Sequence, residues 1–168
     1  GFSRACLGEE QRRASVPDLG IMDKDSKIYI AGVGTLVGAA LMRQLAGQGY
    51  KNIIGEPLQE PLFSDPAQVD ADIASSRPEY VFLVAGESGG IGANQQYPAR
   101  LMLDNLTVAC NVISSAHRHG VKKLLHLASS CVYPRDCPQP MKEDALLTGL
   151  LESTNEAYAV AKIAGLKL

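Results

Sequence analysis

A tyrosine and a lysine four residues apart, Tyr158 and Lys162, are the side chains whose types and spacing most clearly suggest chemistry. On an α-helix, residues i and i+4 share one face, so the phenol and the ammonium would point into the same space. A neighbouring ammonium favours the phenolate and lowers a pKa that is ordinarily about 10. We therefore predict that Tyr158 donates a proton in the reduction of a ketone near neutral pH. Alone, this spacing is a weak signal, because it also arises by chance on solvated helix faces.

Two further reactive side chains lie upstream, in the string Ser129-Ser130-Cys131-Val132-Tyr133-Pro134. Ser129 follows an expected strand at its carboxyl end, where open α/β sheets bind ligands. Its hydroxyl could hold a carbonyl oxygen within reach of Tyr158, and the alternative is a turn serine that caps local backbone. Cys131 would act as a base only where its surroundings favour the thiolate. A buried and inert thiol is the competing interpretation.

A glycine-rich turn, with Gly32, Gly34 and Gly38 in the spacing Gly-x-Gly-x-x-x-Gly, follows the first expected strand. Glycines let the backbone approach a pyrophosphate, and the next helix offers N–H groups and the positive end of its dipole. The turn therefore predicts dinucleotide binding, against the alternative of a merely tight turn. Glu56, after the second expected strand, is the candidate acceptor for an adenosine ribose hydroxyl. The alternative for Glu56 is an ordinary surface carboxylate.

The elements that must position these residues alternate along the chain. Apolar runs predict strands at residues 28–31, 52–54, 80–84 and 123–127. Helical periodicity predicts helices at residues 36–45, 67–76 and 98–119 and around the Tyr158–Lys162 pair. This alternation is typical of parallel βαβ units and predicts an α/β fold with a doubly wound parallel sheet, a Rossmann domain. We expect the strand order 3-2-1-4, with one edge bare.

Residues 1–26 show neither strand nor helix periodicity, and we predict that they form a disordered N-terminal extension. Residues 27–168 would form the dinucleotide-binding domain. A chain of 168 residues with 46% hydrophobic residues fits one domain with a real core. The net charge of −2 argues against nucleic acid or an anionic membrane as the main partner. No apolar run approaches the ~20 residues of a membrane span.

Four cysteines are present without CxxC spacing, and the three histidines show no metal-ligand spacing. We predict reduced thiols in a cytoplasmic protein, neither a disulfide framework nor a metal site. Import into an organelle through residues 1–26 stays open. The cysteines are Cys6, Cys110, Cys131 and Cys137.

From residue 27 to residue 168 the chain resembles the N-terminal half of the GDP-L-fucose synthases, a branch of the extended short-chain dehydrogenase/reductases. The similarity rests on Gly89-Gly90-Ile91, on the Ser129–Pro134 string and on Asn155-Glu156-Ala157-Tyr158-Ala159-Val160-Ala161-Lys162. The last two strings are specific to this branch. The resemblance implies a Rossmann domain that binds NADP(H) and the nucleotide sugar GDP-4-keto-6-deoxy-D-mannose. The family epimerises this sugar at two carbons beside the ketone and then reduces the ketone with hydride.

The resemblance also implies roles for single residues. Ser129 and Tyr158 would polarise and protonate the carbonyl oxygen. Lys162 would hold the nicotinamide ribose, and Cys131 would be the epimerisation base. The implied substrate-binding residues are Gly89, Gly90 and Ser129. The implied cofactor-binding residues are Gly32, Gly34, Thr35, Leu36, Val37, Gly38, Glu56, Ala85, Leu127 and Lys162.

The glycine turn departs from the family pattern. The family has Gly-x-x-Gly-x-x-Gly, with an arginine at the third position that helps to bind the 2′-phosphate. Here Gly34 takes the place of that arginine, and Thr35 replaces the middle glycine. Glu56 stands where a basic residue is expected and would repel a phosphate. We therefore expect weaker discrimination for NADPH over NADH than in the family, so that NAD(H) could also serve.

The resemblance ends within the family's first half. Later strands, the histidine that serves as epimerisation acid and the substrate-binding domain have no counterpart in these 168 residues. We expect an NAD(P)-dependent nucleotide-sugar epimerase/reductase, present here as a fragment without turnover of its own. A longer protein would pair as a homodimer through its long helices. The nearest enzymatic rival is another nucleotide-sugar epimerase or dehydratase of the superfamily.

The alternative class is a non-enzymatic structural or accessory subunit derived from a short-chain reductase. The altered turn, Glu56 and the early end of the chain favour it. In that case a partner in a larger assembly would cover the bare edge of the sheet.

Overall fold

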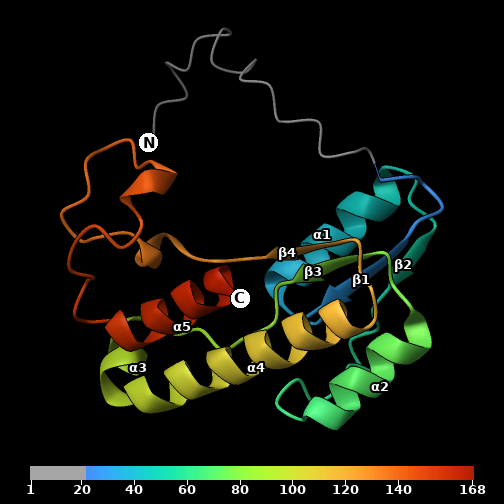
Figure 1. Cartoon of the computed structure of the whole chain (residues 1–168), viewed down its shortest axis with the longest axis horizontal. Coiled ribbons are helices and arrows are strands. Elements are labelled where there is room, and N and C mark those ends of the chain that lie inside the picture. Colours follow the sequence, from blue (N-terminus) through green and yellow to red (C-terminus); the bar gives the residue numbers. More distant parts are fainter. Residues whose placement is uncertain (1–21) are drawn as a thin grey trace, which may run out of the picture.

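The computed structural model describes residues 22–168, so residues 1–21, most of the predicted extension, lie outside the described part of the chain. Residues 23–26 form a turn, and Met22 packs against the core. Strands and helices then alternate along the chain (Figure 1). They are β1 (Lys27–Ala31), α1 (Leu36–Gly47), β2 (Asn52–Ile54), α2 (Pro66–Ser76), β3 (Tyr80–Leu83), α3 (Ile91–Gln96), α4 (Pro98–Arg118), β4 (Lys123–His126), the 3-10 helices η2 (Ser130–Val132) and η3 (Glu143–Ala145), and α5 (Glu156–Lys167).

The four strands form one parallel sheet in the order β2-β1-β3-β4. The predicted α/β fold with a parallel Rossmann sheet is confirmed, but the predicted order 3-2-1-4 is wrong. Pro57 and Pro61 interrupt the segment after β2, and prolines cannot donate to a strand ladder. Among residues 22–168 no further strand forms beside β2, so the chain crosses through α2 to the other side of β1. The direction of winding therefore switches between β1 and β3.

Local signals set the ends of the helices. Thr35 caps α1 by accepting a hydrogen bond from the Gly38 N–H at 3.0 Å. Asp65 caps α2 in the same way, and Gly120, with a φ of 70°, follows the end of α4. The sequence pattern predicted no helix or strand between residues 84 and 98, where α3 lies.

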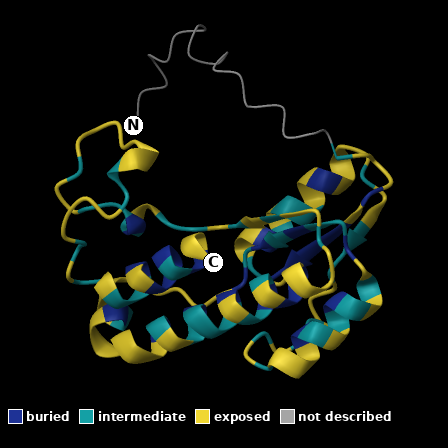
Figure 2. Ribbon diagram, in the orientation of Figure 1, coloured by how far each residue is buried: buried dark blue, intermediate teal, exposed yellow. Residues whose placement is uncertain are grey.

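The sheet is covered by helices on both faces (Figures 1 and 2). On one face α2 and α4 pack on the strands, and α5 lies against α4. On the other face α1 covers β1 and β2. The buried residues of the first face include Tyr29, Ala31, Val69, Ile73, Val81, Leu83, Ala85, Val112 and Ala116. Those of the second face are Ile28, Ile30, Val33 and Leu45.

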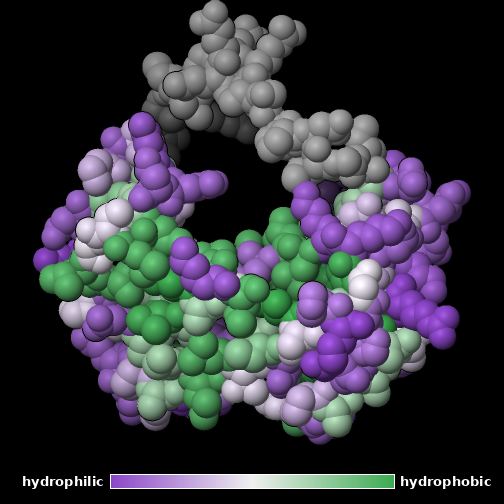
Figure 3. Space-filling model, in the orientation of Figure 1, coloured by the Kyte–Doolittle hydropathy of each residue, from purple (hydrophilic) through white to green (hydrophobic). Residues whose placement is uncertain are grey.

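The outer strand β4 is less covered than the centre of the sheet. Within the described part of the chain it pairs only with β3, as the expected bare edge requires. Leu125, which lies beside Phe82 in the ladder, keeps 46% of its surface exposed. Apolar side chains also gather over α5 and the segment before it (Figure 3), with Leu150 and Leu166 exposed. The homodimer expected from the resemblance stays a prediction.

Within residues 22–168, none of the helices combines the length and the apolar character that crossing a membrane requires.

Candidate active site

The glycine turn lies where β1 ends beside β3. Gly32 has a φ of 101°, and a Cβ atom there would stand 2.5 Å from the backbone nitrogen of Ala85. Gly38, in the first turn of α1, would place a Cβ atom 2.0 Å from the carbonyl oxygen of Gly32. Only glycine permits these two approaches. They hold the start of α1 against the carboxyl ends of β1 and β3.

Glu60, a residue that the sequence pattern did not single out, holds this turn. The Glu60 carboxylate accepts hydrogen bonds from the backbone N–H groups of Gly32 and Val33 at 2.7 Å and of Gly34 at 3.2 Å. Glu56 is exposed and lines a different hollow. Two carboxylates follow β2, and the path of the loop between Pro57 and Pro61 determines which one reaches the turn. Sequence spacing alone carries no signal for that path.

A cavity of about 410 Å³ runs from the glycine turn along the ends of β1 and β3. Four of the predicted cofactor residues line it: Gly32, Gly34, Thr35 and Ala85. The other lining residues are Glu60, Pro61, Leu62, Phe63, Ser64, Gly86, Glu87, Asp104 and Val108. The cavity lies at the point where the winding of the sheet reverses, the usual place for a nucleotide in a doubly wound fold.

The remaining predicted cofactor residues lie around this cavity. Leu36 and Val37 begin α1 and are exposed, and the first N–H groups of a helix have no intrahelical acceptor. Gly38 is buried beneath the turn, whereas Glu56 is separate from it. Leu127 continues the ladder of β4, where its N–H donates to the carbonyl oxygen of Leu83 at 2.9 Å.

A second cavity, of about 210 Å³, brings three of the four predicted catalytic residues together. Ser129 comes from the loop after β4, Cys131 from η2 and Tyr158 from the first turns of α5. The cavity is lined by Ser88, Gly89, Asn94, Ser129, Cys131, Asn155 and Tyr158. Gly90, predicted with Gly89 at the sugar, caps the start of α3 next to this cavity. The Ser129 hydroxyl also accepts from the Cys131 N–H at 3.3 Å, so the serine caps η2 as well.

Lys162 lies between the ends of β3 and β4. Its Nζ donates to the carbonyl oxygen of Leu127 at 3.4 Å and lies 5.7 Å from the centre of the Tyr158 ring. A Cβ atom at Gly86 would be 3.5 Å from this nitrogen. The side chain is buried, and among the described residues it takes part in no ion pair. Burial lowers the pKa of Lys162.

The acidity of Tyr158 differs from the sequence prediction. Burial raises the pKa of this phenol above its ordinary value, and a charge on Cys131 acts in the same direction, whereas the Ser129 hydroxyl opposes them. The predicted lowering by Lys162 is therefore wrong, because desolvation dominates and the ammonium is directed at Leu127. A raised pKa keeps the phenol protonated at neutral pH, which is the form that donates to a ketone oxygen.

Asn105, on α4, is a residue of this region that the sequence did not single out. Its side chain is buried, and its amide nitrogen donates to the carbonyl oxygens of Glu87 at 2.8 Å and Leu101 at 2.7 Å. Its Oδ1 has no partner within the described part of the chain, and a Cβ atom at Gly86 would meet it at 2.5 Å. The residue thus fixes the loop after β3.

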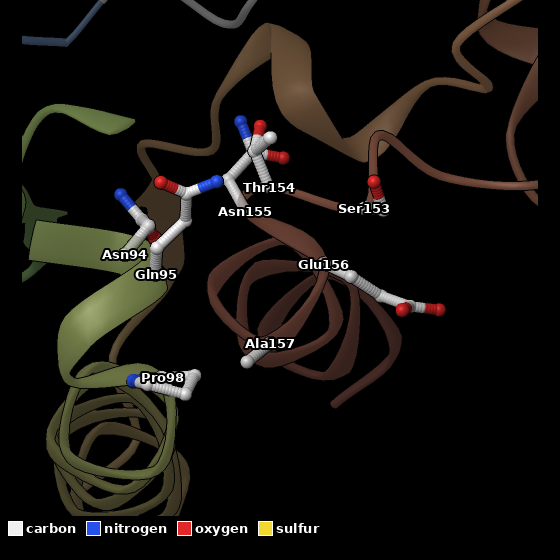
Figure 4. A pocket seen from close by; sticks show the side chains of 8 residues that line it. All are labelled: Asn94, Gln95, Pro98, Ser153, Thr154, Asn155, Glu156 and Ala157. Atoms are coloured by element: carbon white, nitrogen blue, oxygen red, sulfur yellow. The ribbon is translucent and has the colours of Figure 1, made fainter. Parts of the chain in front are cut away.

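A third cavity, of about 330 Å³, adjoins the catalytic one (Figure 4). It lies between the junction of α3 with α4 and the start of α5, and it shares Asn94 and Asn155 with the catalytic cavity. Polar side chains such as Gln95, Ser153 and Glu156 surround it. The two cavities together offer polar space for a ligand larger than a single ketone group. Among residues 22–168 no cluster of His, Cys, Asp and Glu side chains is arranged to hold a metal ion.

Comparison with known proteins places this geometry in a wider group. Residues 28–168 match the NAD dependent epimerase/dehydratase family. GDP-L-fucose synthase 1 from Arabidopsis thaliana is 50% identical over 145 residues, which cover 86% of this chain and 45% of that protein. GDP-L-fucose synthase from Escherichia coli (strain K12) is 44% identical over 142 residues, covering 84% of this chain and 44% of that protein.

A similar solved structure is MlghC, a GDP-mannoheptose C4 reductase from Campylobacter jejuni with NADP bound. It superposes with a TM-score of 0.81 at 36% identity, covering 86% of this chain and 46% of that one. The chain spans about 45% of the length of the curated relatives it matches.

Proposed function

Because the chain belongs to the NAD dependent epimerase/dehydratase family, we propose that it is part of a nucleotide-sugar epimerase/reductase of the GDP-L-fucose synthase type. The substrate would be GDP-4-keto-6-deoxy-D-mannose. The observation that carries this proposal is the single cavity shared by Ser129, Cys131 and Tyr158. Epimerisation beside a ketone needs a base and a held carbonyl oxygen, and reduction needs a proton donor. These three side chains supply the three groups.

In the proposed epimerisation, the Cys131 thiolate takes the proton from the carbon next to the ketone. The S–H bond forms as the C–H bond breaks, and the electron pair moves toward the carbonyl oxygen to give an enolate. The hydroxyl groups of Ser129 and Tyr158 hold that oxygen. Return of a proton to the opposite face of the carbon inverts it, and the donor of this proton lies outside the residues named here.

The residues present fit a nicotinamide dinucleotide. The cavity at the glycine turn and the first N–H groups of α1, which have no intrahelical acceptor, offer contacts to its phosphates and hydroxyls. Lys162, between the ends of β3 and β4, would hold the nicotinamide ribose. When bound, the nicotinamide would supply hydride to the carbonyl carbon. Tyr158 would then donate its phenolic proton to the oxygen. NADP(H) is the expected form, since MlghC carries NADP.

Turnover in D₂O tests this function. The protein purified from its natural source should convert GDP-4-keto-6-deoxy-D-mannose with NADPH, and deuterium should enter the two carbons beside the ketone. In a Cys131→Ser variant, we expect deuterium exchange to fall by about 100-fold or more, because a hydroxyl is a far weaker base than a thiolate. NADPH oxidation without deuterium exchange would mean that the protein reduces the ketone at C4 but does not epimerise the sugar. Neither reaction, together with no nucleotide binding, would favour the structural subunit.

The hydrogen bonds of Glu60 favour the second candidate, a structural or accessory subunit. The Glu60 carboxylate already satisfies three N–H groups of the turn, so it occupies the place where a cofactor turn ordinarily offers donors to an anion. A chain without need of a cofactor would retain such an internal cap. Binding of NADPH or NADH to the chain, measured by calorimetry, separates the two candidates.

The preference between the two cofactors forms a prediction of its own. Glu60 places negative charge beside the turn, and a Cβ atom at Gly34 would lie 3.2 Å from its carboxylate. We expect the wild-type affinities for NADPH and NADH to differ by less than about tenfold, and Gly34→Arg to shift the ratio about tenfold toward NADPH. Gly47→Arg adds the same charge at the far end of α1 and should leave the ratio unchanged. A strong NADPH preference of the wild type would contradict this prediction.

A further inference from the structure

Asn155 stands at the start of α5 but does not cap it. Asparagine is among the most favoured N-cap residues, because its side chain accepts a hydrogen bond from an N–H of the first turn. Here the Asn155 side chain makes no such bond. Its backbone is nevertheless held, since its N–H donates to the carbonyl oxygen of Glu152 at 3.1 Å and its carbonyl oxygen accepts from Ala159 at 3.0 Å. The side chain has therefore been turned from the helix toward something else.

The side chain is directed at the sulfur of Cys131. The Asn155 Nδ2 donates to the Cys131 Sγ at 3.1 Å, across 24 positions of sequence. The other end of the amide, Oδ1, is buried and has no hydrogen-bond partner in the described part of the chain. Buried polar atoms are nearly always paired, yet this amide leaves its oxygen unpaired while its nitrogen bonds to the sulfur.

We propose that Asn155 is the positioning residue that favours the thiolate of Cys131. A hydrogen bond from an amide N–H stabilises an anionic sulfur more than a neutral one. The sulfur of a neutral thiol is a weaker acceptor, so the same bond stabilises it less. The role of Cys131 as the base rests on the function proposed above. The contact itself is a property of this chain and is testable without substrate.

The same contact links the base to the proton donor. Negative charge on Cys131 raises the pKa of Tyr158. By favouring the thiolate, Asn155 also keeps the phenol protonated in the same cavity. The base and the proton donor are thus held together in one cavity.

Alkylation kinetics test the proposal. In a Cys6→Ser, Cys110→Ser, Cys137→Ser background, Cys131 is the one cysteine left of the four in the chain. Its thiolate displaces iodide from iodoacetamide, a C–S bond forms as the C–I bond breaks, and intact mass follows the reaction. At pH 7 we expect Asn155→Ala to slow alkylation about tenfold and Asn155→Asp to slow it further, because a carboxylate repels the thiolate.

The pH dependence separates this electrostatic role from a structural one. At pH 10 any accessible thiol is largely ionised, so the rates of the variants and the parent should converge. Ser88→Ala changes another side chain of the same cavity that is not bonded to the sulfur, and it should react at the parent rate. Alkylation of Asn155→Ala at the parent rate at pH 7, or equal slowing at both pH values, would overturn the proposal. If Asn155→Ala slows alkylation but the protein does not turn over the nucleotide sugar, the proposed contact stands and only the proposed function is refuted.

Discussion

Gly38→Ala is expected to destabilise the chain by about 2 kcal/mol or more, although the same change inside a helix ordinarily stabilises it by up to about 1 kcal/mol. The added methyl group would stand 2.0 Å from the Gly32 carbonyl oxygen and 2.7 Å from the Val33 Cα, both of them backbone atoms that cannot move aside cheaply. The turn would have to open, and the N-terminus of α1 would shift away from the cavity. Urea unfolding followed by circular dichroism measures the change, and calorimetry should show loss of nucleotide binding.

Gly47 provides the matched control in the same helix. A Cβ atom there would meet nothing within 4 Å, so Gly47→Ala should be neutral or stabilise the chain by a few tenths of a kcal/mol, as propensity alone dictates near a helix end. Opposite signs at the two positions are the expected result. Equal effects would mean that the close approach of Gly38 to the turn does not exist in solution.

The wild-type chain should lose stability as the pH falls from 6.5 to 4, and His126→Leu is expected to abolish most of that loss. His126 ends β4, both of its ring nitrogens are buried without a partner among the described residues, and α5 lies on the ring at Gly165. Burial, and after it the charge of Lys162, lower the pKa of His126 to about 4. In the unfolded state His126 therefore binds a proton below its ordinary pKa of about 6.5. In the folded state it binds one only near pH 4.

Because of this difference in proton uptake, the chain becomes less stable as the pH falls. Stability is fully present above about pH 6.5 and declines as the pH falls toward about 4. Because the ring keeps partial contact with solvent, we expect wild type to lose about 1 to 2 kcal/mol through this group between pH 7.5 and pH 5. His126→Leu should lack that loss in urea unfolding at the two pH values. His117→Leu, on the exposed surface of α4, should retain it. A loss of wild-type size in His126→Leu would exclude His126 as its source.

Much of the fold followed from local pattern. The apolar runs at β1, β2, β3 and β4 and the long amphipathic period of α4 are properties of neighbouring residues, so they can be recognised without the fold. Helix α3 could not, because it is six residues long, begins at Gly90 without a side-chain cap and contains Gly92. The strand order was misjudged for a different reason. Which side of β1 a strand joins depends on the path of the chain between strands, and no local pattern records that path.

The sequence by itself determined which reactive side chains the chain carries. The spacing of Tyr158 and Lys162 and the place of Ser129 after a strand pointed to ketone chemistry, whereas the role of Cys131 as a base came from the family resemblance. Their roles stay proposals. Tertiary structure alone placed three of the four, Ser129, Cys131 and Tyr158, in one cavity, brought Glu60 to the glycine turn and directed Asn155 to the sulfur. It also reversed the expected shift of Tyr158, since desolvation and the distance to a charge depend on which distant segments pack together.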